Sequence, residues 1–273
     1  MKKLLIVMLL NIPVQLFSQE PAQVRRLGYD TVSIHHEHAY NREELKIYNR
    51  ISNRLYKAGT LLNGKKEGIW RTYNENGTLN RVEEFHSDVS NGILLTFETN
   101  GSLQREQYSQ NGALEGILHE YSGGILKLEE VYENGKLNGW RRVFTQEGKL
   151  QEEGIWKNGQ RDSINRWYYP NGKMLITYTY RYGTIAGPSK SYSESGKIKA
   201  EGNYFNNLED GSWREYYESG LLSAEGNYTS GKKSGDWKIY SEDGNLMKTQ
   251  LYKNGLLIKE RVESKCDVLK MSQ

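Results

Sequence analysis

Glutamates recur at regular distances along this chain, at Glu106, Glu130, Glu153, Glu201 and Glu225. Paired carboxylates catalyse glycoside hydrolysis when two of them converge on one bond. Carboxylates that recur at a constant interval instead lie one interval apart on a repetitive surface. We therefore interpret this column as a solvent-facing ladder opposite lysines and arginines, and we predict that the protein is not an enzyme.

The densest group of possible metal ligands is the run His35-His36-Glu37-His38. A first-row transition metal would accept imidazole and carboxylate ligands. In an extended strand, however, His36 and His38 share one face while His35 and Glu37 share the other, so this run alone does not assemble a compact site. We expect a solvated polar strand or loop, with no metal and no other cofactor.

Cys266 is the single cysteine of the chain and lies near its end. One thiol cannot form an internal disulfide, although it could pair between chains. A catalytic thiol needs a positioned base, and no histidine follows His119. We therefore predict no catalytic residues.

The element that positions all these side chains is a repeat of 24 residues. Eight units open at Gly68, Gly92, Gly116, Gly139, Ser163, Gly187, Gly211 and Gly235. Their sixth residue is always aromatic: Tyr73, Phe97, Tyr121, Phe144, Tyr168, Tyr192, Tyr216 and Tyr240. Self-similarity at such a period is the mark of a repeat architecture.

Glycines mark two turns in most units, with Asp88 and Asn207 in place of the second glycine in two of them. One glycine column lies nine residues after the unit start, at Gly77, Gly101, Gly148, Gly172, Gly196, Gly220 and Gly244, and a second lies four residues before the next start. Such positions suit the positive φ angles of tight hairpin turns. Between the turns, runs rich in Trp, Tyr, Leu and Ile predict strands.

These signals predict an all-β fold, an elongated single-layer antiparallel meander of about eight β-hairpin repeats. We expect the Tyr/Phe column and an aliphatic column to stack between neighbouring units as a continuous apolar ladder. An isolated hairpin is marginal in water, so each unit depends on its neighbours.

The ends of the chain complete the domain organisation. Lys2, Lys3 and the apolar run that follows predict a signal peptide over residues 1–19, without a cysteine for lipid attachment, and hence an exported, periplasmic or secreted protein. An uncleaved N-terminal anchor is the alternative. We assign residues 20–58 to a short N-terminal cap, 59–258 to the repeat array and 259–273 to a C-terminal tail. Residues 41–56 are either a short amphipathic helix or a degraded repeat.

The middle units depart from the pattern. A tryptophan two residues after the start is present at Trp70, Trp213 and Trp237, but Leu94, Leu118, Arg141, Asn165 and Ser189 replace it elsewhere. The third unit is one residue short, with Gly123-Gly124 where a longer turn is expected. This irregularity is either drift or a docking site.

The units Gly211-Ser-Trp-Arg-Glu-Tyr216 and Gly235-Asp-Trp-Lys-Ile-Tyr240, each followed by a glycine and a leucine, resemble the MORN-repeat variant of bacterial proteins, often labelled as YwqK-type antitoxin-like. The resemblance covers roughly three quarters of the chain. It implies a β-hairpin array that acts by contact with a partner, without catalytic residues.

A rival resemblance concerns one unit and its neighbours. Trp156, then Trp167-Tyr168-Tyr169 followed by Pro-Asn-Gly172, is similar to the aromatic repeats of choline-binding cell-wall modules. Aromatic cages hold quaternary ammonium groups by cation–π attraction. The alternative function is therefore a glycan- or choline-binding module of the cell envelope.

We predict a non-enzymatic, exported scaffold that binds a protein partner through exposed side chains on one face. Its net charge is +3, and +1 without Lys2 and Lys3, which predicts no nucleic-acid partner and no anionic membrane. No membrane span is expected after signal cleavage, and the free edge of the array allows end-to-end self-association. The predicted contact residues are Trp213, Tyr217, Trp237, Trp167 and Tyr169.

Overall fold

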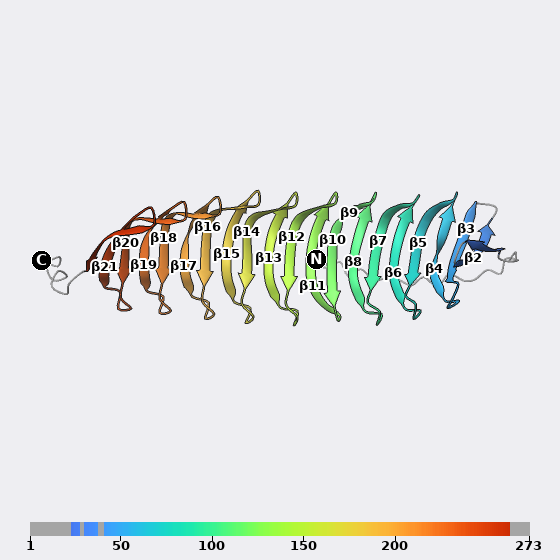
Figure 1. Ribbon diagram of the computed structural model, residues 1–273, viewed down its shortest axis with the longest axis horizontal. Coiled ribbons are helices and arrows are strands. Elements are labelled where there is room, and N and C mark those ends of the chain that lie inside the picture. Colours follow the sequence, from blue (N-terminus) through green and yellow to red (C-terminus); the bar gives the residue numbers. More distant parts are fainter. Residues whose placement is uncertain (1–22, 28–29, 38–40, 263–273) are drawn as a thin grey trace, which may run out of the picture.

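The chain forms one open antiparallel sheet drawn out along a single axis (Figure 1). The computed structural model describes residues 23–27, 30–37 and 41–262, and this part of the chain contains 22 strands and no helix. The prediction of an elongated single-layer meander is confirmed. No helix that could cross a membrane occurs within these residues. The strands are β1 (Gln23–Leu27), β2 (Asp30–Glu37), β3 (Arg42–Asn49), β4 (Leu55–Leu62), β5 (Lys65–Tyr73), β6 (Leu79–His86), β7 (Val89–Phe97), β8 (Leu103–Gln110), β9 (Ala113–Leu114), β10 (Gly116–Ser122), β11 (Ile125–Glu133), β12 (Lys136–Phe144), β13 (Leu150–Lys157), β14 (Gln160–Tyr168), β15 (Met174–Arg181), β16 (Thr184–Tyr192), β17 (Ile198–Phe205), β18 (Leu208–Tyr216), β19 (Leu222–Thr229), β20 (Lys232–Tyr240), β21 (Leu246–Lys253) and β22 (Leu256–Val262).

Each strand pairs with the next one along the chain, except that β9 and β10 both pair with β8 and together occupy one place in the sheet. The described strands of the predicted N-terminal cap pair in the same way. Strands β1 to β3 extend the sheet from β4 outward, so residues 41–56 form a degraded repeat and the helical alternative is wrong. At the other end β22 continues to Val262, four residues past the predicted end of the array.

Two kinds of turn alternate along the edges of the sheet. The two-residue turn Asn63-Gly64 has φ angles of 52° and 77°, as a type I′ hairpin turn requires, and the same pair of positive angles recurs at each later turn of this kind. The longer turn after β5 is closed by the bond from Asn74 N to Thr78 O, 2.8 Å, with Gly77 at φ 87°. Both glycine columns therefore occupy the turns that the sequence predicts. The exception is the third unit, whose long turn is replaced by Gly123-Gly124.

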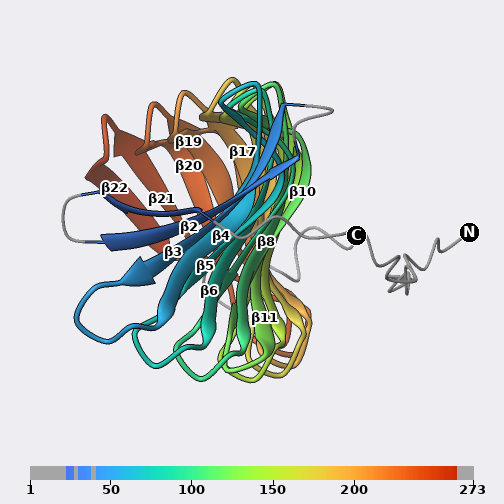
Figure 2. The same cartoon turned by 90° about the vertical axis from the view of Figure 1, so that its right-hand side faces the viewer.

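The glycine that opens most units lies inside a strand. Gly68, at φ 67°, is opposite Phe85 on β6, next to a register shift between β4 and β5. Such bulges bend the strand and increase its twist. Viewed along the axis, the strands are strongly curved and the sheet twists from one end to the other (Figure 2).

The two faces of the sheet differ in composition. One face, which we call the packed face, carries the column that begins with Trp70 and includes the fully buried Leu118, Asn165 and Trp237. Successive residues of a strand point to opposite faces. The residue after each of these side chains therefore points to the other face, which we call the charged face.

Aromatic rings pack against one another on the packed face, but not those of the predicted ladder. A chain of edge-to-face contacts, with ring centroids 5.2 to 5.8 Å apart, joins Trp167, Tyr178, Tyr204, Trp213, Tyr228 and Trp237. Tyr204 and Tyr228 belong to a further aromatic column seventeen residues after the unit start. Three of the sixth-residue tyrosines, Tyr168, Tyr216 and Tyr240, instead hydrogen-bond to the glutamate column, as described below.

Candidate interaction surface

A single row of side chains crosses the charged face, with one residue on each strand. Strand register places acids and bases alternately opposite one another from β8 to β20, with Thr177 as the neutral member of this row. We call this set the charged row: Glu106, His119, Glu129, Arg142, Glu153, Arg166, Thr177, Lys190, Glu201, Arg214, Glu225 and Lys238.

The ion pairs within the charged row are mostly long. Lys190 Nζ lies 2.9 Å from Glu201 Oε2, but Arg214 Nε and Lys238 Nζ lie 3.7 and 3.9 Å from the carboxylate of Glu225. Lys190, Arg214 and Lys238 keep 44%, 57% and 51% of their side chains exposed. Exposed pairs of this kind contribute at most about 1 kcal/mol to stability. These bases therefore remain accessible to another molecule.

The short third unit changes which glutamate joins the charged row. Because this unit has one residue fewer, Glu129 pairs with His119 and Arg142, and Glu130 turns to the packed face. A shift of one residue moves a side chain to the opposite face of a sheet. Glu130 is buried and accepts hydrogen bonds from Tyr132 Oη at 2.7 Å and Arg141 Nε at 2.9 Å. Its assignment to the solvent-facing column is wrong.

Tyrosines partly cover the glutamates of the charged row. The hydroxyls of Tyr168, Tyr216 and Tyr240 donate to Glu153, Glu201 and Glu225 at 2.8, 2.7 and 2.9 Å. Burial, and then the bond to Glu153, raise the pKa of Tyr168 to about 12. The bonds from Lys190 and Tyr216 lower the pKa of Glu201. The carboxylates therefore face their bases as predicted, but they are half-buried hydrogen-bond acceptors rather than freely solvated groups.

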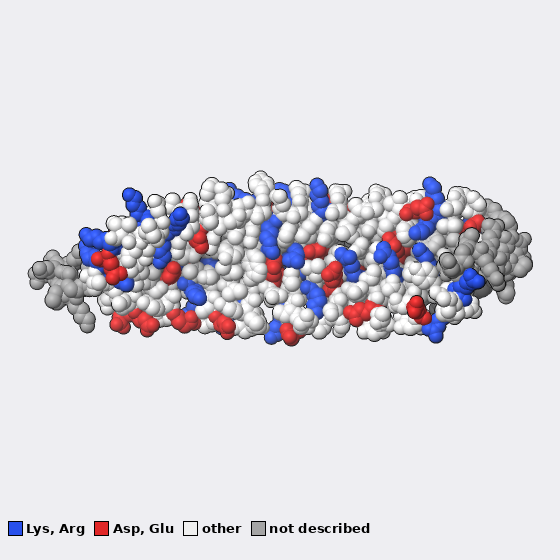
Figure 3. All heavy atoms as spheres, in the orientation of Figure 1, with Lys and Arg blue, Asp and Glu red and all other residues white. Residues whose placement is uncertain are grey.

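Two adjacent hollows lie along the charged row where the repeats are most regular. One, of about 390 Å³, is lined by Lys190, Glu201, Asn203, Ser212 and Arg214 among others. The next, of about 200 Å³, also includes Ser212 and Arg214 and extends to Glu225, Asp236 and Lys238. Similar groups thus recur one repeat, or about 10 Å, farther along the sheet. The view in Figure 3 likewise shows acidic and basic side chains interspersed along the molecule.

The predicted contact residues lie outside the charged row. Trp213 and Trp237 belong to the aromatic chain of the packed face, and Trp237 is 0% exposed, which leaves it no surface to offer. Tyr217 and Tyr169 donate their hydroxyls to the backbone carbonyls of Tyr240 and Tyr192, at 2.6 and 2.8 Å. Trp167 Nε1 donates to Glu152 at 3.2 Å. The sequence predicts lysines and arginines opposite the glutamates, but Lys190, Arg214 and Lys238 are not among the predicted contact residues, although they recur at the repeat period.

Two rings of the choline-binding resemblance, Trp156 and Trp167, already contact a cation of this chain together with Tyr180. The guanidinium carbon of Arg161 lies 5.2, 5.1 and 5.6 Å from the ring centroids of Trp156, Trp167 and Tyr180. Cation–π attraction operates at such distances. The position that a quaternary ammonium group would need is therefore occupied by Arg161.

The candidate metal ligands do not form a cluster in the described part of the chain, where no group of three or more His, Cys, Asp or Glu side chains is placed to hold a metal ion. Of the run from His35 to His38, only His35 has a described side chain. Cys266 and the predicted signal peptide lie outside the described residues.

Comparison with known proteins supports the repeat. The family model of the MORN repeat variant matches residues 66–86, 161–182, 186–206, 209–230 and 233–254. No curated protein matches the chain. The matched segments comprise β5–β6 and the units from β14 to β21, and they include the three units that carry Trp70, Trp213 and Trp237. Five segments of this β-hairpin array thus match the MORN repeat variant.

Proposed function

We propose that this protein is a non-enzymatic scaffold that binds a protein partner through the charged row. The observation that carries the proposal is the alternation of exposed bases and fixed carboxylates on consecutive strands. Glu153, Glu201 and Glu225 are each held by a tyrosine hydroxyl, so these carboxylates are ordered before a partner arrives. Preorganised groups lose less conformational entropy on binding.

Repetition supplies affinity that no single contact has. Rim-exposed charges contribute little individually, but a row that repeats every 10 Å or so lets several weak contacts form at once. Alternation also sets register, because a partner shifted by one strand would meet like charges, and such juxtapositions disfavour binding. The MORN repeat variant, generally an interaction module, supports the same class of function.

The proposal includes export. Lys2, Lys3 and the apolar run over residues 4–10 support a secretory signal, so the partner would be a protein of the cell envelope or the medium. Neutralising a toxin, as the antitoxin-like label implies, would be one form of this contact. Glycan or choline binding is less favoured because Arg161 fills the aromatic cage.

The test is proximity crosslinking with residues 20–273 expressed in the native envelope, using a charge-reversed triple variant, Lys190→Glu, Arg214→Glu and Lys238→Glu. A matched control reverses Lys173, Lys232 and Lys253, which lie at turns outside the row. We expect one stoichiometric protein to be recovered with the wild type and the control, and lost with the row variant. Recovery that is unchanged by the row variant, or recovery mainly of wall glycan, would overturn the proposal. Signal cleavage is checked separately by N-terminal sequencing of the exported protein.

A further inference from the structure

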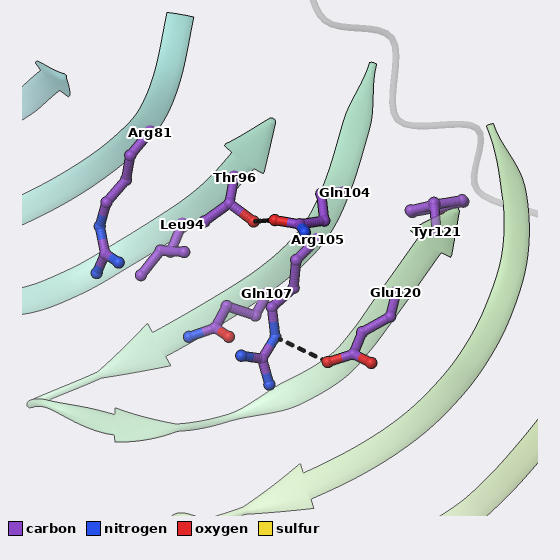
Figure 4. Close-up of a pocket in the computed structure, with 8 residues that line it drawn as sticks. All are labelled: Arg81, Leu94, Thr96, Gln104, Arg105, Gln107, Glu120 and Tyr121. Carbon is purple, nitrogen blue, oxygen red and sulfur yellow. Dashed lines mark hydrogen bonds and ion pairs between the residues drawn. The ribbon is translucent and has the colours of Figure 1, made fainter. Parts of the chain in front are cut away.

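A polar hollow interrupts the packed face between β6 and β10. It has a volume of about 570 Å³ and is formed by side chains of four strands (Figure 4). Arg81 comes from β6, Leu94 and Thr96 from β7, Gln104, Arg105 and Gln107 from β8, and Glu120 and Tyr121 from β10. The guanidinium groups of Arg81 and Arg105 extend in the same direction in Figure 4.

Hydrogen-bond donors outnumber acceptors in this hollow. Arg105 Nε is buried, lies 3.5 Å from Glu120 Oε1 and makes no hydrogen bond, and its two Nη atoms have no partner among the described residues. Arg81 Nε donates to Glu83 Oε2 at 2.9 Å and Nη2 lies 2.9 Å from the same oxygen, while Nη1 makes no hydrogen bond among the described residues. Gln104 only accepts, from Thr96 at 3.4 Å, and Gln107 makes no hydrogen bond within this part of the structure. A ligand that fits would supply oxygen acceptors.

The hollow coincides with breaks in the repeat. The aromatic column that includes Tyr204 and Tyr228 has Ser109 at this unit, and the long turn beside Tyr121 is shortened to Gly123-Gly124. Along the same row of the sheet, Arg81 and Arg105 occupy the places that Ile176, Ala200 and Ala224 hold in the later units, and Thr96 and Glu120 occupy those that Ser191, Glu215 and Ile239 hold. Here the chain replaces packing groups with charged and amide groups.

We propose that this hollow binds an acidic side chain, Glu or Asp, in an extended segment of the protein partner. The inference rests on the proposed function and adds a specific anchor on the opposite face from the charged row. A carboxylate can accept two parallel hydrogen bonds from the guanidinium of Arg105, the geometry of a bidentate pair. The amides of Gln104 and Gln107 beside it suit the donors and acceptors of a peptide backbone.

Charge in the hollow selects among anions. Arg81, Arg105 and Glu120 leave one net positive charge on the lining residues, and Glu83 beside the hollow already engages Arg81. A singly charged carboxylate needs only the guanidinium of Arg105, whereas the second charge of a phosphate would face Glu120 and Glu83 without a counter-ion. An acidic sugar would present the carboxylate but not the backbone amides that Gln104 and Gln107 can pair with.

The experiment measures the arginine side-chain N–H signals of residues 20–273 by NMR at low salt. The probes are acetyl-Gly-Glu-Gly-amide, the same peptide with Gln, glucuronate and inorganic phosphate. We expect saturable shifts of the Arg105 signal with the Glu peptide, at millimolar concentration, and binding at least about tenfold weaker for the Gln peptide, because bonds to a charged group are the stronger ones. Arg105→Lys keeps the charge but loses the planar fork, so it should also weaken binding. Arg181→Lys is the control, because Arg181 is an exposed arginine at the end of β15 that belongs neither to the hollow nor to the charged row.

Glu120→Gln provides a readout that does not require removing Arg105. This change removes the competing carboxylate, so it should tighten binding of the Glu peptide severalfold. No saturable shift, equal binding of the Gln peptide, tighter binding of glucuronate or phosphate, or an unchanged affinity in Glu120→Gln would each overturn the inference. The proposed function would stand in those cases if capture by the charged row were intact.

Discussion

Strands β18–β20 and strands β11–β14 fill the packed face with different chemistry. In the first region Trp213, Tyr228 and Trp237 meet edge to face, and Gly226 lies beneath the indole of Trp237, where a Cβ would come within 2.4 Å of the ring. In the second region Arg141 takes the tryptophan position and belongs to a network of charged groups. Glu152 accepts from Arg161 at 2.6 Å and from Arg141 at 3.3 Å, while Arg141 also pairs with Glu130 at 2.9 Å.

The contrast shows that backbone and packing are specified separately. The turns and bulges that determine the meander are nearly the same in both regions, since the glycine and type I′ positions recur throughout. On the packed face, a large side chain on one strand is opposite a small residue on the neighbouring strand. Gly202 is opposite Trp213, and Ser189 is opposite Tyr178. A repeat whose turns determine its backbone can therefore place polar groups in its middle without losing the fold. The polar hollow lies beside that middle region.

The largest effect is expected where a ring is fully enclosed. Trp237→Ala removes a side chain that is buried against Tyr228 and Gly226, and such truncations destabilise proteins by about 3–5 kcal/mol. Because the stability of a repeat array is a sum over units and interfaces, the loss should concentrate in β18–β21. Hydrogen exchange resolved by strand measures it.

Ser189→Ala is the control for this prediction, because Ser189 occupies the equivalent place with a small side chain. It should change the opening free energy by less than about 1 kcal/mol. Equal losses in the two variants, or a loss spread evenly from β5 to β22, would contradict the view that the aromatic region stabilises itself locally.

The ionic region, strands β11–β14, should become less stable when its shared carboxylate, Glu152, is removed. Glu152→Leu leaves Arg141 and Arg161 without their common partner and frees Trp167 Nε1. Breaking a fully buried pair costs more, but these side chains are 16–25% exposed, so we expect a loss of about 2 kcal/mol in β12–β14. Adding Arg161→Leu should recover part of the lost stability, because no unpaired cation then remains beside the new leucine.

Glu153→Leu is the matched control, since this carboxylate is equally exposed, one residue on, and faces the charged row. Arg142 and Arg166 lie 3.6 and 3.7 Å from the Glu153 carboxylate, so Glu153→Leu should cost about half as much stability as Glu152→Leu. A double variant that is less stable than Glu152→Leu alone would show that the network is not destabilised by an unpaired charge.

The sequence predicts most of the backbone, because the period of Gly77, Gly101 and their equivalents reports directly on turns. It predicts less of the packing. Tyr168, Tyr216 and Tyr240 are regular enough to suggest an apolar ladder, but each hydroxyl reaches a glutamate across the strand pair. Which columns touch depends on register and on the bulge at each unit start, and periodicity alone carries no information about either.

The functional groups are harder to predict for the same reason. Glu130 matches the glutamate column by counting, yet the missing residue in the third unit turns it to the packed face. Trp237 is conspicuous by type and spacing, and it is enclosed. The hollow combines Arg81, Arg105 and Glu120, residues 39 positions apart at most, through the pairing of β6, β7, β8 and β10. A deviation from the repeat was visible in the sequence, but not the cavity it produces.

Alkaline pH should weaken a bond of the ionic region. Burial, followed by the bond to Glu130, raises the pKa of Tyr132 to about 12, above its value of 10 in a free side chain. A raised pKa means that the folded state holds this proton more tightly. The stabilising contribution of Tyr132 is therefore complete below pH 10 and is lost as the pH rises through 12.

Tyr132→Phe should remove that part of the pH dependence and cost about 1 kcal/mol at neutral pH. Urea unfolding midpoints at pH 9 and pH 11.5 provide the comparison, and Tyr192→Phe is the control because that hydroxyl makes no hydrogen bond among the described residues. If the urea midpoint of Tyr132→Phe falls as steeply as that of the wild type between the two pH values, the bond to Glu130 does not contribute as inferred.

Salt should have the smallest effect and should separate the two regions most directly. At 1 M salt the Debye length is about 3 Å, so the attraction among Glu130, Arg141, Glu152 and Arg161 is screened wherever solvent reaches it. The rings of Trp213, Tyr228 and Trp237 hold no net charge and depend mainly on burial, with one cation–π contact from Lys233 Nζ, 3.9 Å from the centroid of Trp237. Raising NaCl from 0.05 to 1 M should lower the opening free energy of β11–β14 by less than about 1 kcal/mol while leaving β18–β20 unchanged or slightly stabilised. Hydrogen exchange at the two salt concentrations measures both regions in one sample, with neither needing a substitution. A uniform response would mean that Glu152 and its arginines act mainly by shape and hydrogen bonding, and the two regions would then differ in composition but not in the kind of force that stabilises them.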